Sequence, residues 1–181
     1  MKKIVISVFS VIMILSLISV SSADAKENKK ESLNNLLTNE VIYSMKQEHL
    51  KYQDITLDTL NQTIQKNFGK PDKLIVNKNN GFTITQNLYT TKNKNKFNFY
   101  TTHLKGDEKF DRLRYLTISL NNKNLKFSKI APVVKRPSQI KKIKNYYEYY
   151  YTVYFKLKLK KIDGELYVTN IYYASLDSLP E

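Results

Sequence analysis

The residues best suited to chemistry gather near the C-terminus, in the stretch KNYYEYYYTVYFKLKLKK that spans residues 144–161. It holds six tyrosines and five lysines, a usage far from that of an average protein. Lysine ammonium groups attract phosphates and other anions, and tyrosine rings beside them add stacking and hydrogen-bonding area. The stretch therefore indicates either a surface that binds a polyanion or a strand whose two faces differ.

Periodicity and turn chemistry predict how these side chains are presented. After residue 149 the chain alternates between apolar and polar side chains, as a strand with one buried face does. Asp163-Gly164 favours a two-residue hairpin turn, which would place Lys156 opposite Ile171. Ahead of this strand, Ser138 can cap a short helix over 139–145. The candidate anion-binding residues are Lys141, Lys142, Lys144, Tyr154, Lys156, Lys158, Lys160 and Tyr167.

A second interpretation of the lysines stays open. Alternating lysines on an exposed strand protect its edge against pairing with other strands. Arginine, which binds phosphate in a bidentate manner, occurs three times in the chain against twenty-seven lysines. The pattern is thus compatible with anion binding and equally with solubility.

The distribution of charge along the chain supports the same pair of interpretations. The net charge is +14, and residues 123–161 contain twelve lysines or arginines against a single acid, Glu148. Residues 162–181 contain four acids and no base. Such clustering is expected of a protein that binds nucleic acid, acidic glycan, anionic lipid or a wall polymer. A solvated lysine face that keeps the protein soluble explains it as well.

Candidates for catalysis and metal binding are few. His49 and His103 are the only histidines, and neither has a second histidine at ligand spacing. Asp107, Glu108 and Asp111 form an acidic loop that lacks the alternating oxygen ligands of a calcium site. We therefore predict no catalytic residue, no metal and no cofactor. A small hydrolase that uses His103 and the nearby acids is kept as an alternative.

The N-terminus has the pattern of a secretory signal peptide. Lys2 and Lys3 precede the apolar run 4–20, and Ala23-Asp24-Ala25 suits signal peptidase, so we predict cleavage after Ala25. An uncleaved membrane anchor is the alternative, although the run is shorter than the roughly 20 residues of a spanning helix. The chain has no cysteine, which excludes disulfides and favours a bacterial source for an exported protein.

Helical periodicity in the first part of the mature chain gives way to alternation. Apolar spacing predicts one helix over 33–49 and another from the N-cap Thr56 to Phe68, ended by Gly69 and Pro71. Alternating segments separated by turn residues predict a meander of four strands, over 73–77, 82–91, 97–104 and 112–120. A short strand over 125–134 is predicted to follow.

The predicted fold class is α+β, with N-terminal helices packed on an antiparallel sheet and a C-terminal helix and β-hairpin. Residues 26–122 are expected to form a half with two helices and the meander. Residues 123–181 are expected to form a basic half with a helix and the hairpin, continuous with the same domain. Pro137 marks the expected seam.

The run ITLDTLNQTIQKNFGKPDKL, residues 55–74, is a capped helix that ends in Gly69, Pro71 and Asp72 and leads into antiparallel strands. Residues 56–120 thereby resemble the helix-plus-meander modules of the BamE/SmpA family and of beta-lactamase-inhibitor-like domains. Those modules bind other proteins, so the resemblance implies an interaction module without catalytic residues. BamE homologues carry a lipobox cysteine that this chain lacks, and the resemblance therefore implies no role in outer-membrane assembly.

In composition and signal peptide the chain resembles the small exported proteins of low-GC Gram-positive bacteria. Our leading hypothesis is a secreted, non-enzymatic binding protein that recognises a host protein or a surface component. The alternative is a protein held at the cell surface by polyanions such as extracellular DNA, glycosaminoglycan or teichoic acid, with nucleic acid bound non-specifically. No membrane span is expected in the mature form.

Overall fold

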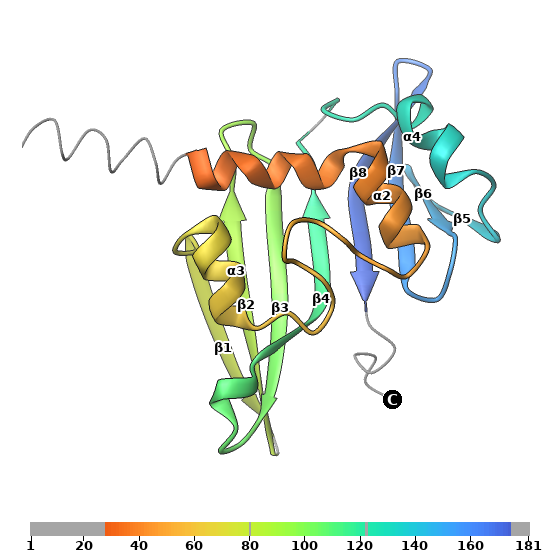
Figure 1. Cartoon of the computed structure of the whole chain (residues 1–181). Coiled ribbons are helices and arrows are strands. Elements are labelled where there is room, and N and C mark those ends of the chain that lie inside the picture. Colours follow the sequence, from red (N-terminus) through yellow and green to blue (C-terminus); the bar gives the residue numbers. More distant parts are fainter. Residues whose placement is uncertain (1–27, 80, 122, 175–181) are drawn as a thin grey trace, which may run out of the picture.

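The protein is described from a computed structural model that covers residues 28–79, 81–121 and 123–174 (Figure 1). The predicted signal peptide lies outside these residues. The helical segments are η1 (Ser32–Leu37), α2 (Asn39–Lys46), α3 (Asn61–Phe68), η2 (Glu108–Phe110) and α4 (Phe127–Val134). The strands are β1 (Lys73–Asn79), β2 (Phe82–Thr90), β3 (Lys96–Leu104), β4 (Arg112–Ser119), β5 (Gln139–Ile143), β6 (Tyr146–Tyr150), β7 (Phe155–Ile162) and β8 (Glu165–Ala174).

All eight strands belong to one antiparallel sheet with the order β1-β2-β3-β4-β8-β7-β6-β5. The first four strands form a meander, and the last four form a second meander. The two meanders join where β4 pairs with β8, in a register that sets Leu116 opposite Tyr173 and Ile118 opposite Ile171. The sheet therefore continues from one half of the chain into the other without a break.

The second half of the chain repeats the course of the first. In each half a helix, α3 or α4, leads through a short connection into four meandering strands. An offset of 66 residues relates Asn61 to Phe127 at the helix starts and Pro71 to Pro137 in the connections. The residue after each helix has a left-handed backbone, with φ values of 78° at Gly69 and 58° at Lys135. The two halves thus share the order of their helix, connection and strands. Few side chains match between them.

The apolar core lies on one face of the sheet, between the strands and the helical segments. Alternation places Phe97 and Phe99 of β3 and Leu157 and Leu159 of β7 on this covered face, all fully buried. The ring of Phe68 from α3 stacks on Phe99, with centroids 5.6 Å apart. Burial of these side chains is the main stabilising contribution, at about 1.5–3 kcal/mol for each fully buried large apolar side chain.

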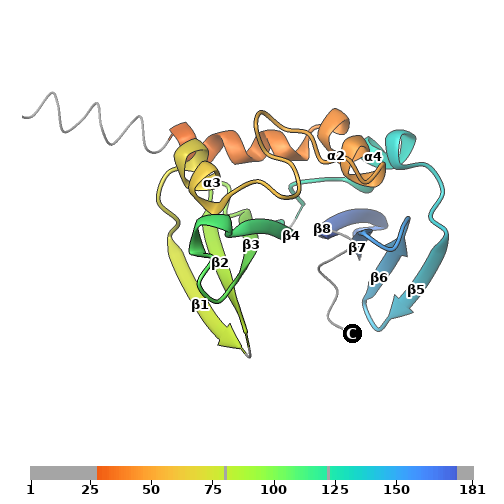
Figure 2. The same ribbon diagram turned by 60° about the horizontal axis from the view of Figure 1, so that its bottom comes forward.

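The opposite face of the sheet, here called the open face, is covered by none of the described helices. Figure 2 shows the sheet arched beneath α2, α3 and α4, with β1 and β5 at its two ends turned away from them. The open face thus lies inside the arch. Along β2, β3 and β7 its side chains are half-buried by their neighbours while every second residue is buried in the core.

The predicted fold class is wrong. The eight-stranded antiparallel sheet dominates the structure, and the helical segments are short. Residues 139–145, predicted as a helix, contain strand β5 and a two-residue turn, and four strands stand where the sequence predicts a helix and a hairpin. The spacing of Ile140 and Ile143 is compatible with a helix. The segment forms a strand because it pairs with β6, where Tyr149 lies opposite Ile140.

One predicted strand and two predicted helices differ from the structure in type or in bounds. The segment predicted as a strand over 125–134 contains helix α4, whose Ile130 and Val134, four residues apart, are both buried. The predicted helix over 33–49 is divided at Thr38, whose side chain accepts the amide N–H of Val41. The second helix begins at Asn61 rather than after Thr56. The four strands of the first meander are confirmed within a few residues at each end.

Candidate functional site

Eight side chains from the second meander form one surface on the open face, here called the Lys/Tyr face. Strand registers bring them together: Lys156 of β7 lies directly between Tyr150 of β6 and Tyr172 of β8. Lys158 lies between Glu148 and Asn170 in the next row. The members of the Lys/Tyr face are Lys141, Tyr146, Glu148, Tyr150, Lys156, Lys158, Lys160 and Tyr172.

A β-bulge decides which aromatic side chain joins the lysines. The register of β7 and β8 shifts between Lys158 and Leu159, so that Thr169 is the extra residue. The predicted pairing of Lys156 with Ile171 is therefore wrong, and Tyr172 stands in that place. Ile171 is instead fully buried on the covered face.

The lysine ammonium groups lie over tyrosine rings. Lys156 Nζ is 4.6 Å from the ring centre of Tyr172 and 5.2 Å from that of Tyr150. Lys158 Nζ is 4.4 Å from the ring of Tyr146, and Lys141 Nζ is 5.1 Å from that of Tyr150. Each such cation–π contact contributes on the order of 0.5–1 kcal/mol at an exposed site. The contacts hold the amines within the face and order the tyrosines.

One acid sits among these cations. The Tyr150 hydroxyl donates to Glu148 Oε2 at 2.5 Å, and Lys156 Nζ lies 3.7 Å from the same oxygen. The hydrogen bond from Tyr150, with Lys156 and Lys158 nearby, holds the pKa of the Glu148 carboxyl below its usual range. The same hydrogen bond raises the pKa of the Tyr150 phenol. Glu148 thus remains ionised, fixes Tyr150 and lowers the net charge of the face.

The tyrosines of the Lys/Tyr face are continued by further tyrosines across the join between the two halves. Tyr100 and Tyr115 form a cross-strand pair with ring centres 5.1 Å apart, and Tyr115 is diagonal to Tyr172. Burial, followed by Tyr172 and Tyr100, raises the pKa of Tyr115 to about 12. The row that includes Lys156 and Tyr150 crosses five strands, from β3 to β6, over about 19 Å at 4.8 Å per strand.

The structure does not bring all the predicted anion-binding residues together. Lys142 pairs with Tyr147 on the side of β5 and β6 opposite the Lys/Tyr face, and Lys144 lies in the β5–β6 turn. Tyr154 lies in the bend before β7. Tyr167 pairs with Lys160 as predicted, but it is buried, and its hydroxyl donates to Glu165. The predicted residues that meet on one surface are Lys141, Lys156, Lys158 and Lys160.

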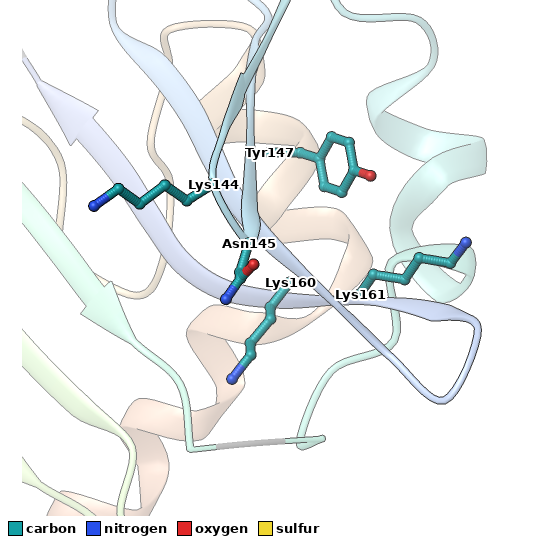
Figure 3. Close-up of a pocket in the computed structure, with 5 residues that line it drawn as sticks. All are labelled: Lys144, Asn145, Tyr147, Lys160 and Lys161. Carbon is teal, nitrogen blue, oxygen red and sulfur yellow. The ribbon is translucent and has the colours of Figure 1, made fainter.

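A shallow hollow of about 310 Å³ lies beside the β5–β6 turn (Figure 3). Its lining residues are Lys144, Asn145, Tyr147, Lys160 and Lys161. The three lysine side chains point in different directions, so their ammonium groups do not meet at one point. The hollow is therefore not built to hold a single small anion.

The alternative catalytic site around His103 contains a histidine and an acid close to each other. His103 Nδ1 lies 3.4 Å from Asp111 Oδ1, and Asn61 Nδ2 donates to the other carboxylate oxygen at 2.8 Å. Both side chains of the His–Asp pair are largely buried on the covered side of the sheet. Among the described residues no group of three or more potential metal ligands converges. No helix within the described ranges is long and apolar enough to span a membrane.

Comparisons with known proteins give one distant likeness. No family model and no curated protein matches the chain. A crystal structure from Streptococcus mutans, that of a "putative beta-lactamase inhibitor protein", aligns with 66% of this chain and 85% of its own at 14% identity and a TM-score of 0.29. This structure partly supports the predicted resemblance to beta-lactamase-inhibitor-like modules. None of the comparisons supports the resemblance to BamE/SmpA. With so low a TM-score, the likeness assigns neither a fold family nor a function.

Sequence reasoning missed the residues that complete the Lys/Tyr face. Tyr146, Tyr150 and Glu148 belong to β6, which the sequence merges with the end of a helix and the start of a strand. Lys144 and Asn145, in the turn between β5 and β6, offered a local signal, because Asn is a preferred turn residue. Tyr172 could not be placed, since the bulge at Thr169 has no sequence signature here.

Proposed function

We propose that this protein is a non-enzymatic binding protein that recognises another protein through the open face of its sheet. The observation that carries the proposal is the Lys/Tyr face, with its ammonium groups stacked on ordered tyrosine rings. A surface of this kind presents a large contact area whose side chains lose little conformational freedom on binding. Tyrosine is enriched at protein interfaces for that reason.

The shape and position of the surface support the same proposal. The open face lies inside the arch of the sheet, so a convex partner can contact several strands at once. Strands hold the tyrosines more rigidly than loops would. Export is part of the proposal, since the N-terminal pattern of residues 1–25 is that of a signal peptide, and an extracellular partner such as a host protein or surface component follows from it.

The test is capture of a partner that depends on the Lys/Tyr face. We expect the wild-type protein, immobilised and exposed to plasma and cell-surface extracts, to retain a protein that a Tyr150→Ala/Lys156→Gln/Tyr172→Ala variant loses. The purified partner should bind the variant at least tenfold more weakly. A Lys51→Gln/Lys66→Gln/Lys70→Gln variant serves as the control, because these exposed lysines lie on the helical side. Equal retention by all three proteins would exclude this surface.

Polyanion binding is the second candidate, favoured by Lys156, Lys158 and Lys160. They alternate along β7, about 6.6 Å apart, which is close to phosphate spacing in an extended nucleic-acid strand. If this function is correct, a Lys156→Gln/Lys158→Gln/Lys160→Gln variant elutes from heparin at lower salt than the control lysine variant. An elution shift equal to that of the control would attribute binding to net charge alone.

A further inference from the structure

The open face of the first meander carries a second surface, of different chemistry, here called the apolar patch. Phe82 of β2 and Leu104 of β3 are directly opposite each other, with 36% and 65% of their surfaces exposed. Ile84 and Leu88 share their face of β2 and are half-buried, and Ile75 of β1 lies opposite Gln86. The apolar patch is Ile75, Phe82, Ile84, Leu88 and Leu104.

The apolar patch and the Lys/Tyr face belong to one continuous surface. The central tyrosine pair, Tyr100 and Tyr115, lies between them, and Gln86 of β2 pairs with Tyr100. Leu88 of β2 shares a row with Lys156 of β7, four strand spacings or about 19 Å away. Phe82 lies farther along β2 in the direction away from Lys158 and Lys160, which adds about 20 Å along the strand. A fully extended segment reaches from Lys156 to Leu88 with about six residues and to Phe82 with about eight.

We propose that the partner is a protein whose docking element is bipartite, with carboxylates over Lys156, Lys158 and Lys160 and apolar side chains over the patch around Phe82 and Leu104. This inference rests on the proposed function and names the chemistry of its partner. Charge complementarity assigns acids to the second meander, which carries four lysines and one acid on the Lys/Tyr face. The exposed apolar side chains of the first meander indicate that the other part of the docking element is apolar.

The contacts of the lysines favour a protein over a nucleic acid or an acidic glycan. The ammonium groups of Lys156 and Lys158 lie over tyrosine rings, and the carboxylate of Glu148 stands beside them. A continuous polyanion bound across the face would be repelled by this carboxylate. Strands β5 to β8 contain no arginine, the residue best suited to phosphate. Sugar phosphates also offer nothing to cover Leu104, whereas a protein offers both chemistries at once.

Selection of random dodecapeptides displayed on phage, with wild-type protein as bait, tests the inference. We expect enriched peptides to carry two or more Asp or Glu residues about six to eight positions from aliphatic or aromatic residues. A synthetic peptide of that consensus should bind at least tenfold more weakly to the Lys156→Gln/Lys158→Gln/Lys160→Gln variant. A Phe82→Ser/Leu104→Ser variant should weaken it to a similar extent, with folding of each variant checked by circular dichroism.

The outcomes separate the inference from the proposed function. Peptides without acids, peptides that bind both variants as well as wild type, or failure to enrich any peptide would overturn the bipartite partner. Binding of heparin or single-stranded DNA that ignores the Phe82→Ser/Leu104→Ser change and displaces the peptide would do so as well. In each case the proposed function stands if a captured protein still depends on Tyr150, Lys156 and Tyr172, and it falls if none does.

Discussion

The two halves of the sheet follow the same course of chain and differ on their open faces. The first meander presents an amide, Gln86, and aliphatic or aromatic side chains such as Ile84 and Phe82. The second presents the Lys/Tyr face. On the covered side both halves are aromatic, with Phe68 against Phe99 in one and Tyr151 against Phe155 in the other. The shared core keeps the covered faces alike, while the open faces are free to take different chemistry.

The outer edges of the two meanders do not share this difference. The edge strand β5 carries Lys141 and Lys142, which discourage pairing with another strand. The edge strand β1 exposes Leu74 and Val76, at 53% and 49% of their surfaces. Strand β5 also exposes Ile140 and Ile143, at 55% and 47%, and β1 also carries the exposed lysines Lys73 and Lys78, so each edge combines charge with exposed apolar surface.

The largest expected effect tests whether the two halves fold as one unit. Phe99→Ala in the first half or Phe155→Ala in the second removes a fully buried ring and should destabilise the protein by about 3–5 kcal/mol. Because β4 and β8 pair, we expect either change to lower the stability of both halves equally. Urea unfolding followed by hydrogen exchange in peptides from each half measures this. Two separate transitions would show that the join does not couple them.

The paired positions after α3 and α4 give the next largest effect. Lys135 has φ 58° and ψ −149°, a region nearly restricted to glycine, which costs about 1–3 kcal/mol for other residues. Gly69, its counterpart, has φ 78° and ψ −168°. We expect Lys135→Gly to stabilise the protein by about 1 kcal/mol and Gly69→Ala to destabilise it by a similar amount. A Cβ on Gly69 would meet no atom within 4 Å, so the loss reports the backbone alone. Thermal unfolding should move in opposite directions, and a shift in the same direction would refute the equivalence.

Alkaline pH probes the tyrosines at the join of the halves. Burial raises the pKa of Tyr115 to about 12, against an ordinary value of 10.0. A raised pKa means that the contribution of Tyr115 is fully present below pH 10 and is lost as the pH rises towards 12. Stability should therefore fall over that range, and less steeply in Tyr115→Phe. Urea midpoints at pH 8 and pH 11 measure the difference, with Tyr43→Phe as an exposed control.

The smallest expected effect concerns the acid within the Lys/Tyr face. The Tyr150 hydrogen bond lowers the pKa of Glu148, so its contribution is present above its ordinary pKa of 4.5 and is lost as the pH falls through the folded value. Glu148 lies at the surface but is half-buried by its neighbours, and since solvent still screens its charge, Glu148→Gln should cost about 1 kcal/mol at neutral pH. The difference from wild type should vanish in acid. The pKa of Tyr150 should also fall in the variant, as measured by phenolate absorbance, and an unmoved phenol titration would contradict the hydrogen bond.

The sequence by itself determined the first meander, the Asp163-Gly164 hairpin and the alternation that places Lys156, Lys158 and Lys160 on the face opposite the core. These features are local: a two-residue turn with positive φ and a period of two follow from neighbouring residues alone. The same reasoning also found the left-handed end of α3 at Gly69. It did not find the corresponding end of α4, because Lys135 is not a residue that prefers that backbone.

Only the tertiary structure decided how the second half is built and which side chains share a surface. Residues 139–143 carry spacings compatible with a helix and with a strand, and pairing with β6 selects the strand. Tyr172 reaches Lys156 through a bulge at Thr169, and the apolar patch joins the Lys/Tyr face through the β4–β8 pairing. Segments this short gain too little from local propensity to fix their own conformation, so contacts between residues far apart in the chain determine it.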